Sequence, residues 1–227
     1  MIEENIKSIK AQLPPTVTLV AVSKLKPVDD IMDAYRAGQR DFGENYATEL
    51  RDKHAVLPAD IRWHFIGHLQ SKQLKYYIDF VSMIHGVDSV EHLEDVERAA
   101  AKAGRVVDVL LQVHVAKEET KFGFAPEELS TIHSPLSTLS NVRVRGLMGM
   151  ATHTDDAARV RADFREVKSI FDSLRQGAFA GSPCFDTLSM GMSHDWPVAV
   201  GEGSTMVRLG TSIFGARDYS KIKKENL

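Results

Sequence analysis

The sequence predicts an α/β protein that folds as a single-domain (β/α)8 TIM barrel. Short runs rich in Val, Ile, Leu and Met alternate with segments of helical periodicity, and eight such runs can be counted. Eight βα units close naturally into a barrel, and 227 residues lie within the usual size of that fold. We therefore expect residues 1–227 to form one domain. An open, doubly wound sheet is the alternative.

The expected strands are the apolar runs. The first, TLVAVS, is almost entirely apolar, which is typical of a strand that is buried on both faces. In order, the expected strands are Thr18–Ser23, Asp41–Gly43, Trp63–Gly67, Val81–His85, Asp108–Val115, Val144–Met150, Thr187–Met190 and Met206–Leu209.

Helical segments fill the intervals between the strands. Two have clear start and stop signals: Asp88-Ser89 precedes one that stops at Gly104, and Thr154-Asp155 precedes a long one that stops at Gly177. The charged tail Lys221–Leu227 is expected to be a solvated chain end. The expected helices are an extra N-terminal one at Glu3–Gln12, then Val28–Ala37, Asn45–Ala55, Ser71–Tyr77, Val90–Ala103, Pro126–His133, Asp155–Gln176 and a short one near Asp195–Val200.

Composition argues against several classes of partner. Lys and Arg total 28 against 31 Asp and Glu, a net charge of −3, so no basic excess suggests a nucleic-acid partner. The N-terminus lacks a secretory signal, and no run approaches the roughly 18 apolar residues of a membrane span. The single cysteine, Cys184, cannot form an intramolecular disulfide and fits a reducing compartment. We expect a soluble, cytoplasmic protein.

Lys24 is chemically unusual because it follows the first apolar strand directly. Period-two alternation puts Val20, Val22 and Lys24 on one face, so Lys24 points into the barrel if the two valines do. A lysine amine at an apolar mouth has its charged form disfavoured, which makes it a candidate Schiff-base nucleophile. The alternative is a lysine that bends out to solvent past the strand end.

Arg208 in the last strand alternates with apolar neighbours and is expected to point inward. A buried arginine needs a partner, such as a carboxylate, a phosphate or a ring nitrogen; a structural ion pair is the simplest alternative. Small and hydroxyl residues follow the last two strands, where many barrels bind phosphate, although such residues also simply form turns. They are Ser189, Gly191, Ser193, Gly210 and Thr211.

Other features indicate no further site. His64 and His68 are four residues apart in a strand and its exit, which is too far for one metal ion, and no third ligand is evident. The segment Gly201–Gly203 lacks the third glycine of a dinucleotide fingerprint and precedes a strand. No phosphate-binding P-loop and no GxSxG nucleophile elbow occur.

Seven segments, spread in order over nearly the whole chain, together form a specific pattern. It closely resembles the YggS/PROSC family of pyridoxal-phosphate homeostasis proteins. Two departures affect local detail: Lys72 stands where the family commonly has Asn, and His114 replaces a frequent Asn. The segments are VAVSKLKP (20–27), FGENY (42–46), WHFIGHLQ (63–70), EETKFGF (118–124), RGLMGMA (145–151), LSMGMSHD (188–195) and GSTMVRLGTSIFG (203–215).

The resemblance implies a type III PLP-binding fold, like the N-terminal domain of alanine racemase, holding pyridoxal 5′-phosphate (PLP) as an internal aldimine. Lys24 matches the family's Schiff-base lysine, and Arg208 matches the arginine that faces the pyridine nitrogen. The phosphate positions are matched by Ser189, Gly210 and Thr211, with Ser193 in addition, and the pocket positions by Asn45, His64 and Met148.

The resemblance further implies a carrier that buffers PLP or delivers it to apo-enzymes. Arg208 would contact an unprotonated ring nitrogen and so weaken carbanion stabilisation. A racemase needs an acid or base on each face of its substrate, and only Lys24 is apparent, with no room for a racemase-like second domain. We therefore expect no catalysis and a monomer. A racemase or decarboxylase of this barrel type, and a PLP-sensing regulatory protein, are the alternatives.

Overall fold

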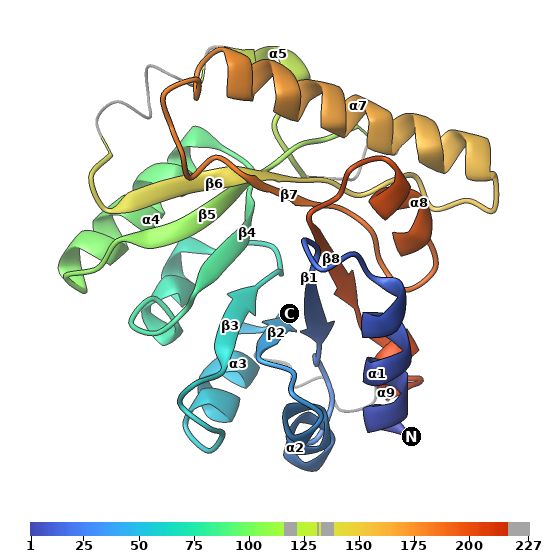
Figure 1. Ribbon diagram of the computed structural model, residues 1–227. Coiled ribbons are helices and arrows are strands. Elements are labelled where there is room, and N and C mark those ends of the chain that lie inside the picture. The colour runs from blue at the N-terminus through green and yellow to red at the C-terminus, as the bar shows by residue number, and fades with distance from the viewer. Residues whose placement is uncertain (116–121, 131, 133–138, 218–227) are drawn as a thin grey trace.

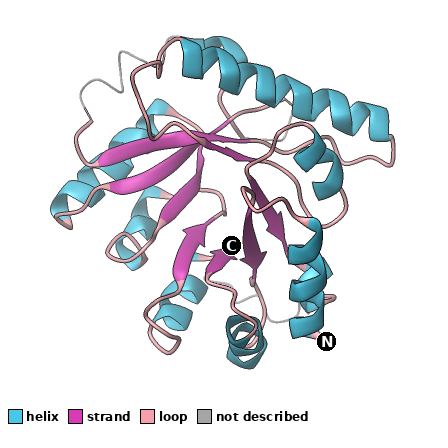
Figure 2. Ribbon diagram, in the orientation of Figure 1, coloured by secondary structure: helices cyan, strands magenta, loops and turns pink. Residues whose placement is uncertain are grey.

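Eight parallel strands close into a barrel in the computed structural model, which describes residues 1–115, 122–130, 132 and 139–217 (Figures 1 and 2). The strands pair in chain order, and β8 pairs with β1 to complete the ring. The predicted closed barrel is thus confirmed. The strands are β1 (Thr18–Val22), β2 (Asp41–Glu44), β3 (Arg62–Phe65), β4 (Met83–Val87), β5 (Val107–Gln112), β6 (Val142–Met148), β7 (Thr187–Ser189) and β8 (Met206–Leu209).

Helices surround the barrel, as Figure 2 shows, and the predicted extra N-terminal helix is present as α1. Among the described residues, no helix is long and apolar enough to cross a membrane. The helices are α1 (Ile2–Gln12), α2 (Val28–Arg36), α3 (Ala47–His54), the 3-10 helix η1 (Ser71–Tyr76), α4 (Val90–Lys102), α5 (Pro126–Ser130), α7 (Ala157–Gln176), α8 (Trp196–Gly201) and α9 (Thr211–Phe214).

Several predicted boundaries are corrected by local hydrogen bonds. The long helix starts at Ala157 because the Asp156 carboxylate accepts from the backbone amides of Ala158 and Arg159. The segment predicted as an α-helix at 71–77 is a 3-10 helix, and α9 was not predicted. The helix end predicted at 133 and the tail 221–227 lie outside the described residues.

Two strands also differ from the prediction. The strand expected to reach residue 115 ends at Gln112, because the chain beyond it leaves the ladder and Val113 forms an isolated bridge with Phe124. The strand expected at 81–85 begins two residues later, at Met83. Val81 belongs to the preceding turn, where its amide donates to the carbonyl of Tyr77.

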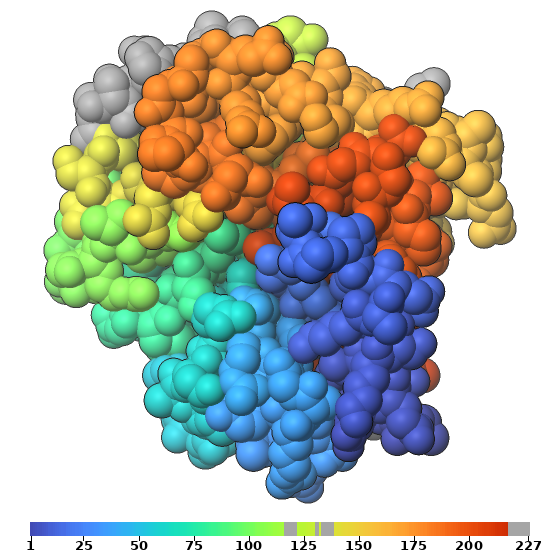
Figure 3. Space-filling model, in the orientation of Figure 1, coloured from blue at the N-terminus to red at the C-terminus, as the bar shows by residue number. Residues whose placement is uncertain are grey.

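The apolar core has two parts. The larger lies between the barrel and its helices, and a smaller cluster fills the barrel interior. Helix α1 packs against α9, and the Asn5 side chain donates to the carbonyl of Ile213 at 2.9 Å. In the space-filling view the N-terminal segment (blue) lies beside the late segment of the chain drawn in red (Figure 3). The interior cluster consists of Val20, Met83, Leu110, Met148 and Met206, with Met150 packed against it.

Candidate functional site

A cavity of about 270 Å³ opens at the carboxyl ends of the strands. This end of a (β/α)8 barrel carries the active sites of such enzymes. Six residues predicted to form the site line the cavity, which brings together segments almost 200 positions apart. Its lining consists of Val22, Lys24, Asn45, Ile66, Met150, Met192, Ser193, His194, Arg208, Gly210, Thr211 and Arg217.

Lys24 is half-buried at the cavity, in line with the period-two prediction from β1. Burial, and then the nearby guanidinium of Arg217, lower the pKa of the Lys24 amine from its ordinary value, while Glu44 and Glu49 oppose this shift. A larger fraction of the amine is therefore uncharged at neutral pH. An uncharged amine is the form that attacks a carbonyl carbon.

A buried ionic cluster supports the turn that carries Lys24. The Lys53 ammonium donates to Glu44 and Glu49, each at 2.7 Å, and to the carbonyl of Ser23 at 2.7 Å. Glu49 also accepts from the backbone amide of Leu25, which has a left-handed φ of 60°. Burial raises the pKa of Glu44 to about 7, although Lys53 opposes the shift. The cluster fixes the strand exit and thus the direction of Lys24.

Arg208 points into the barrel, as the alternation of β8 predicts, and is 5% exposed. Its Nη1 donates to the carbonyl of Ser189 at 2.9 Å and to the Ser189 hydroxyl at 2.6 Å, and its Nη2 donates to the carbonyl of Gly149 at 3.3 Å. Burial lowers the pKa of Arg208 to about 10, with Asp195 opposing, so the side chain is a cation at neutral pH. It is a buried donor that is held by neutral oxygens.

The β8 exit presents backbone amides beside open space. The Ser193 hydroxyl accepts from the amides of Gly210 and Ser212, at 3.1 and 3.3 Å. A Cβ on residue 210 would lie 2.0 Å from Nη2 of Arg217, so only glycine leaves this space to a neighbouring group. Nε of Arg217 is buried without a hydrogen-bond partner, as is Oδ1 of Asn45. Both polar groups at the cavity are thus available to a ligand.

Three predicted site residues do not line this cavity. Ser189 is fully buried beneath it and contacts Arg208 through its hydroxyl. His64 lies in the barrel interior, where it contacts Asp41 and His85, and Met148 belongs to the apolar interior cluster. None of the three is among the residues that line the cavity, and their predicted contacts with the cofactor stay predictions.

Sequence reasoning missed several lining residues, of which Arg217 and His194 carry functional groups. Arg217 follows the turn at Gly215, whose φ is 71°, and this turn brings the guanidinium back over the β8 exit. The sequence signal for Arg217 was a basic residue shortly after Gly210 and Thr211, which were expected to bind phosphate. Among the described residues, no three metal-ligating side chains are grouped closely enough to hold a metal ion.

The alanine racemase N-terminal domain family matches residues 1–218. A pyridoxal phosphate homeostasis protein from Pseudomonas aeruginosa is 39% identical over 230 residues, which cover 96% of each chain. The chain belongs to the pyridoxal phosphate homeostasis protein family. This confirms the resemblance drawn from the seven sequence segments.

Solved structures of similar proteins share the fold of this chain. PipY from Synechococcus elongatus is 40% identical to this chain. The match covers 95% of this chain and all of PipY. The TM-score is 0.89 for PipY without PLP and 0.87 for PipY with PLP bound. An alanine racemase from Clostridium difficile, 17% identical with a TM-score of 0.73, shares the fold, and the chain covers 62% of it.

Proposed function

We propose that this chain binds PLP reversibly at the barrel mouth and buffers or delivers it within the cell. One observation carries the proposal: a half-buried lysine with a lowered pKa, a buried arginine and a glycine that leaves open space line one cavity. The relatives' name and the PLP-bound PipY structure support it. The donor set fits the three polar parts of the cofactor, which are an aldehyde, a ring nitrogen and a phosphate.

Each part of the cofactor has a matching group in the cavity. The Lys24 amine would hold the aldehyde carbon, and the Arg208 guanidinium would donate to the ring nitrogen. The phosphate would lie in the space beside Gly210 and accept from the side chain of Thr211, while the Ser193 hydroxyl, which accepts from the Gly210 amide, supports the loop. We add Arg217 as a phosphate ligand, since a guanidinium is suited to phosphate geometry.

Two further predicted residues, Ser189 and Asn45, support the site in this proposal. Ser189 orients Arg208 through the 2.6 Å hydrogen bond, and Asn45 presents its unpaired Oδ1 to the cavity. When bound, the cofactor supplies a reactive aldehyde that condenses reversibly with a primary amine. Lys24 would protect that aldehyde from other amines, and Arg208 would keep the ring nitrogen unprotonated by donating to it.

The buffering proposal is tested by transfer to an acceptor. The protein is loaded with PLP, freed of excess ligand and mixed with an apo-enzyme that requires PLP. We expect the acceptor to become active while no amino acid is turned over by the donor alone. Retention of all PLP by the donor would contradict delivery. We also expect a monomer in solution.

A second candidate, amino-acid racemisation, is favoured by His194, which lines the cavity together with Lys24. A histidine there could supply the second acid or base that racemisation requires. Steady conversion of a chiral amino acid by the wild type, lost in His194→Gln, would establish this activity. We expect no such conversion, because the homeostasis proteins, and not the racemases, are the near relatives.

A further inference from the structure

A line of polar side chains crosses the interior of the barrel from one end to the cavity. Asp41 Oδ1 lies 3.1 Å from His64 Nε2, and His64 Nδ1 lies 2.9 Å from His85 Nε2. His85 Nδ1 lies 3.4 Å from the Ser189 hydroxyl, which lies 2.6 Å from Arg208 Nη1. We call these five residues the interior network.

The interior network is a long-range feature of the closed barrel. His85 lies on β4 and Ser189 on β7, strands that are separated by β5 and β6 in the ring, so this contact passes through the interior. Asp41 is the first residue of β2 and therefore lies at the amino-terminal end of the barrel, while Arg208 lines the cavity at the other end. The network thus spans the barrel.

Donor and acceptor roles are fixed at both ends. A guanidinium can only donate, so the Ser189 oxygen accepts from Arg208 and its own proton is free for Nδ1 of His85. With Nδ1 as acceptor, neutral His85 carries its proton on Nε2 and donates to Nδ1 of His64. His64 then donates from Nε2 to the carboxylate of Asp41. Every hydrogen bond therefore points toward Asp41.

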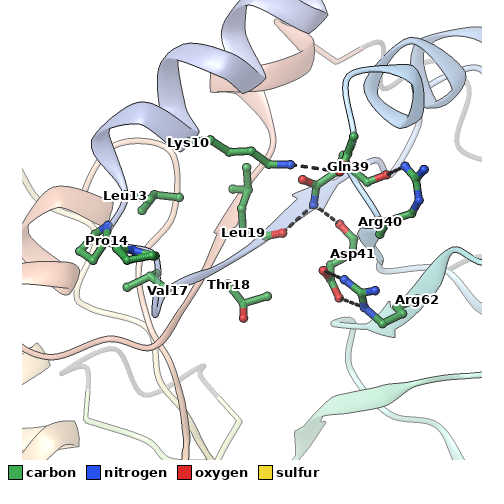
Figure 4. Close-up of a pocket in the computed structure, with 12 residues that line it drawn as sticks. Lys10, Leu13, Pro14, Val17, Thr18, Leu19, Gln39, Arg40, Asp41 and Arg62 are labelled. Carbon is green, nitrogen blue, oxygen red and sulfur yellow. Dashed lines mark hydrogen bonds and ion pairs between the residues drawn. The ribbon is translucent and has the colours of Figure 1, made fainter.

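The charges at the two ends agree with this direction. Burial, above all, lowers the pKa of His85 well below its ordinary value, so the ring is neutral. Burial alone would raise the pKa of Asp41, but hydrogen bonds from His64 and Arg62 lower it to about 2. Figure 4 shows the pairing of Asp41 with Arg62 beside a second cavity of about 360 Å³, which lies at the amino-terminal ends of β1 and β2.

We propose that His85 and His64 are positioning residues that hold the Ser189 hydroxyl in the orientation that accepts from Arg208. This inference rests on the proposed function, since Arg208 is the group that would face the ring nitrogen. Without His85, the Ser189 hydroxyl has no fixed acceptor, and one of the three hydrogen bonds that hold the guanidinium is weakened. PLP affinity then depends on a residue that does not line the cavity.

The first test needs no PLP. Long-range ¹H–¹⁵N correlation spectra of the unliganded protein report which ring nitrogen of each histidine carries the proton. We expect neutral His85 with its proton on Nε2, and Ser189→Ala to shift the Nδ1 resonance of His85. A proton on Nδ1 of His85, or a charged His85 ring at neutral pH, would overturn the proposal.

The second test compares variants of one strand. We expect His85→Leu to weaken PLP binding about tenfold, the effect of losing one buried hydrogen bond, with a shifted visible spectrum of the bound cofactor. His85→Gln keeps a donor and an acceptor and should recover part of the loss. The matched control, Met83→Leu, changes an interior side chain two residues away at similar volume and should bind normally.

The outcomes separate the two proposals. Equal PLP affinity of His85→Leu and Met83→Leu would overturn the positioning role. Failure of the wild type to bind PLP would contradict the proposed function, and the histidine tautomers would still decide whether the network is ordered as described. If His85→Leu does not fold, Ser189→Ala serves as the second variant, with the same expected loss of affinity.

Discussion

Gly210 leaves open space at the β8 exit, where we propose that the phosphate of PLP binds. A methyl group there would meet only the flexible end of Arg217 within 3 Å, and the carbonyl of Val22 at 3.2 Å. We therefore expect Gly210→Ala to fold with nearly wild-type thermal stability but to bind PLP at least about tenfold more weakly, because it fills the phosphate position. Titration of the visible spectrum and a thermal melt measure the two effects. Unchanged affinity would contradict the phosphate assignment.

Asp41 links the stability of the protein to pH. Because its pKa is lowered from 3.8 to about 2, the carboxylate contributes about 2 kcal/mol above pH 4. This contribution is lost as the pH falls from 4 toward 2. We expect Asp41→Asn to be less stable than the wild type by that amount at pH 6, with the difference shrinking in acid. Urea unfolding at several pH values measures it.

Asp52→Asn is the control for the acid experiment, since Asp52 forms an exposed ion pair with Arg51. Exposed pairs contribute about 0–1 kcal/mol, so its stability should follow that of the wild type. A difference between the wild type and Asp41→Asn that stays constant from pH 6 to pH 2 would contradict the pKa argument.

At the scale of elements, the cluster of Lys53, Glu44 and Glu49 joins helix α3 to the exits of β1 and β2. Lys53→Met would leave the buried Glu44 and the half-buried Glu49 without their cation, and we expect a loss of about 3–5 kcal/mol at pH 8. The loss should be smaller near pH 6, where Glu44, with a pKa of about 7, takes up a proton. Chemical unfolding at the two pH values measures both.

Arg51→Met is the matched control on the same helix. It breaks an exposed ion pair with Asp52 and should cost less than about 1 kcal/mol. Equal destabilisation by the two variants would show that the cluster does not stabilise the turn before α2.

At the scale of the whole molecule, the sequence predicted what depends on local periodicity. The alternating apolar runs predicted eight strands and their closure, and the register of β8 predicted that Arg208 points inward. Lys24, Gly210 and Thr211 were predicted together because barrel exits gather at one end. These features follow from the order of the elements along the chain and from the alternation of side chains, every second residue, along a strand.

Features that depend on tertiary contacts were not predictable in this way. The contact of His85 with Ser189 joins strands that are not neighbours, so no local pattern indicates it. Arg217 reaches the cavity through a turn whose path depends on the packing of α9. Predicted pocket roles for His64 and Met148 came from resemblance alone, and the structure places both in the barrel interior.

The measurement that tests the central claim most directly is the covalent mapping of bound PLP. The protein is incubated with PLP, reduced with borohydride and digested, and the modified peptide is identified by mass spectrometry. Lys26→Ala is the control beside Lys24→Ala, since Lys26 binds the carbonyls of Phe214 and Ala216 outside the cavity lining. We predict modification at Lys24 in the wild type and in Lys26→Ala, and its loss in Lys24→Ala. The same modified peptide in all three proteins would contradict the account.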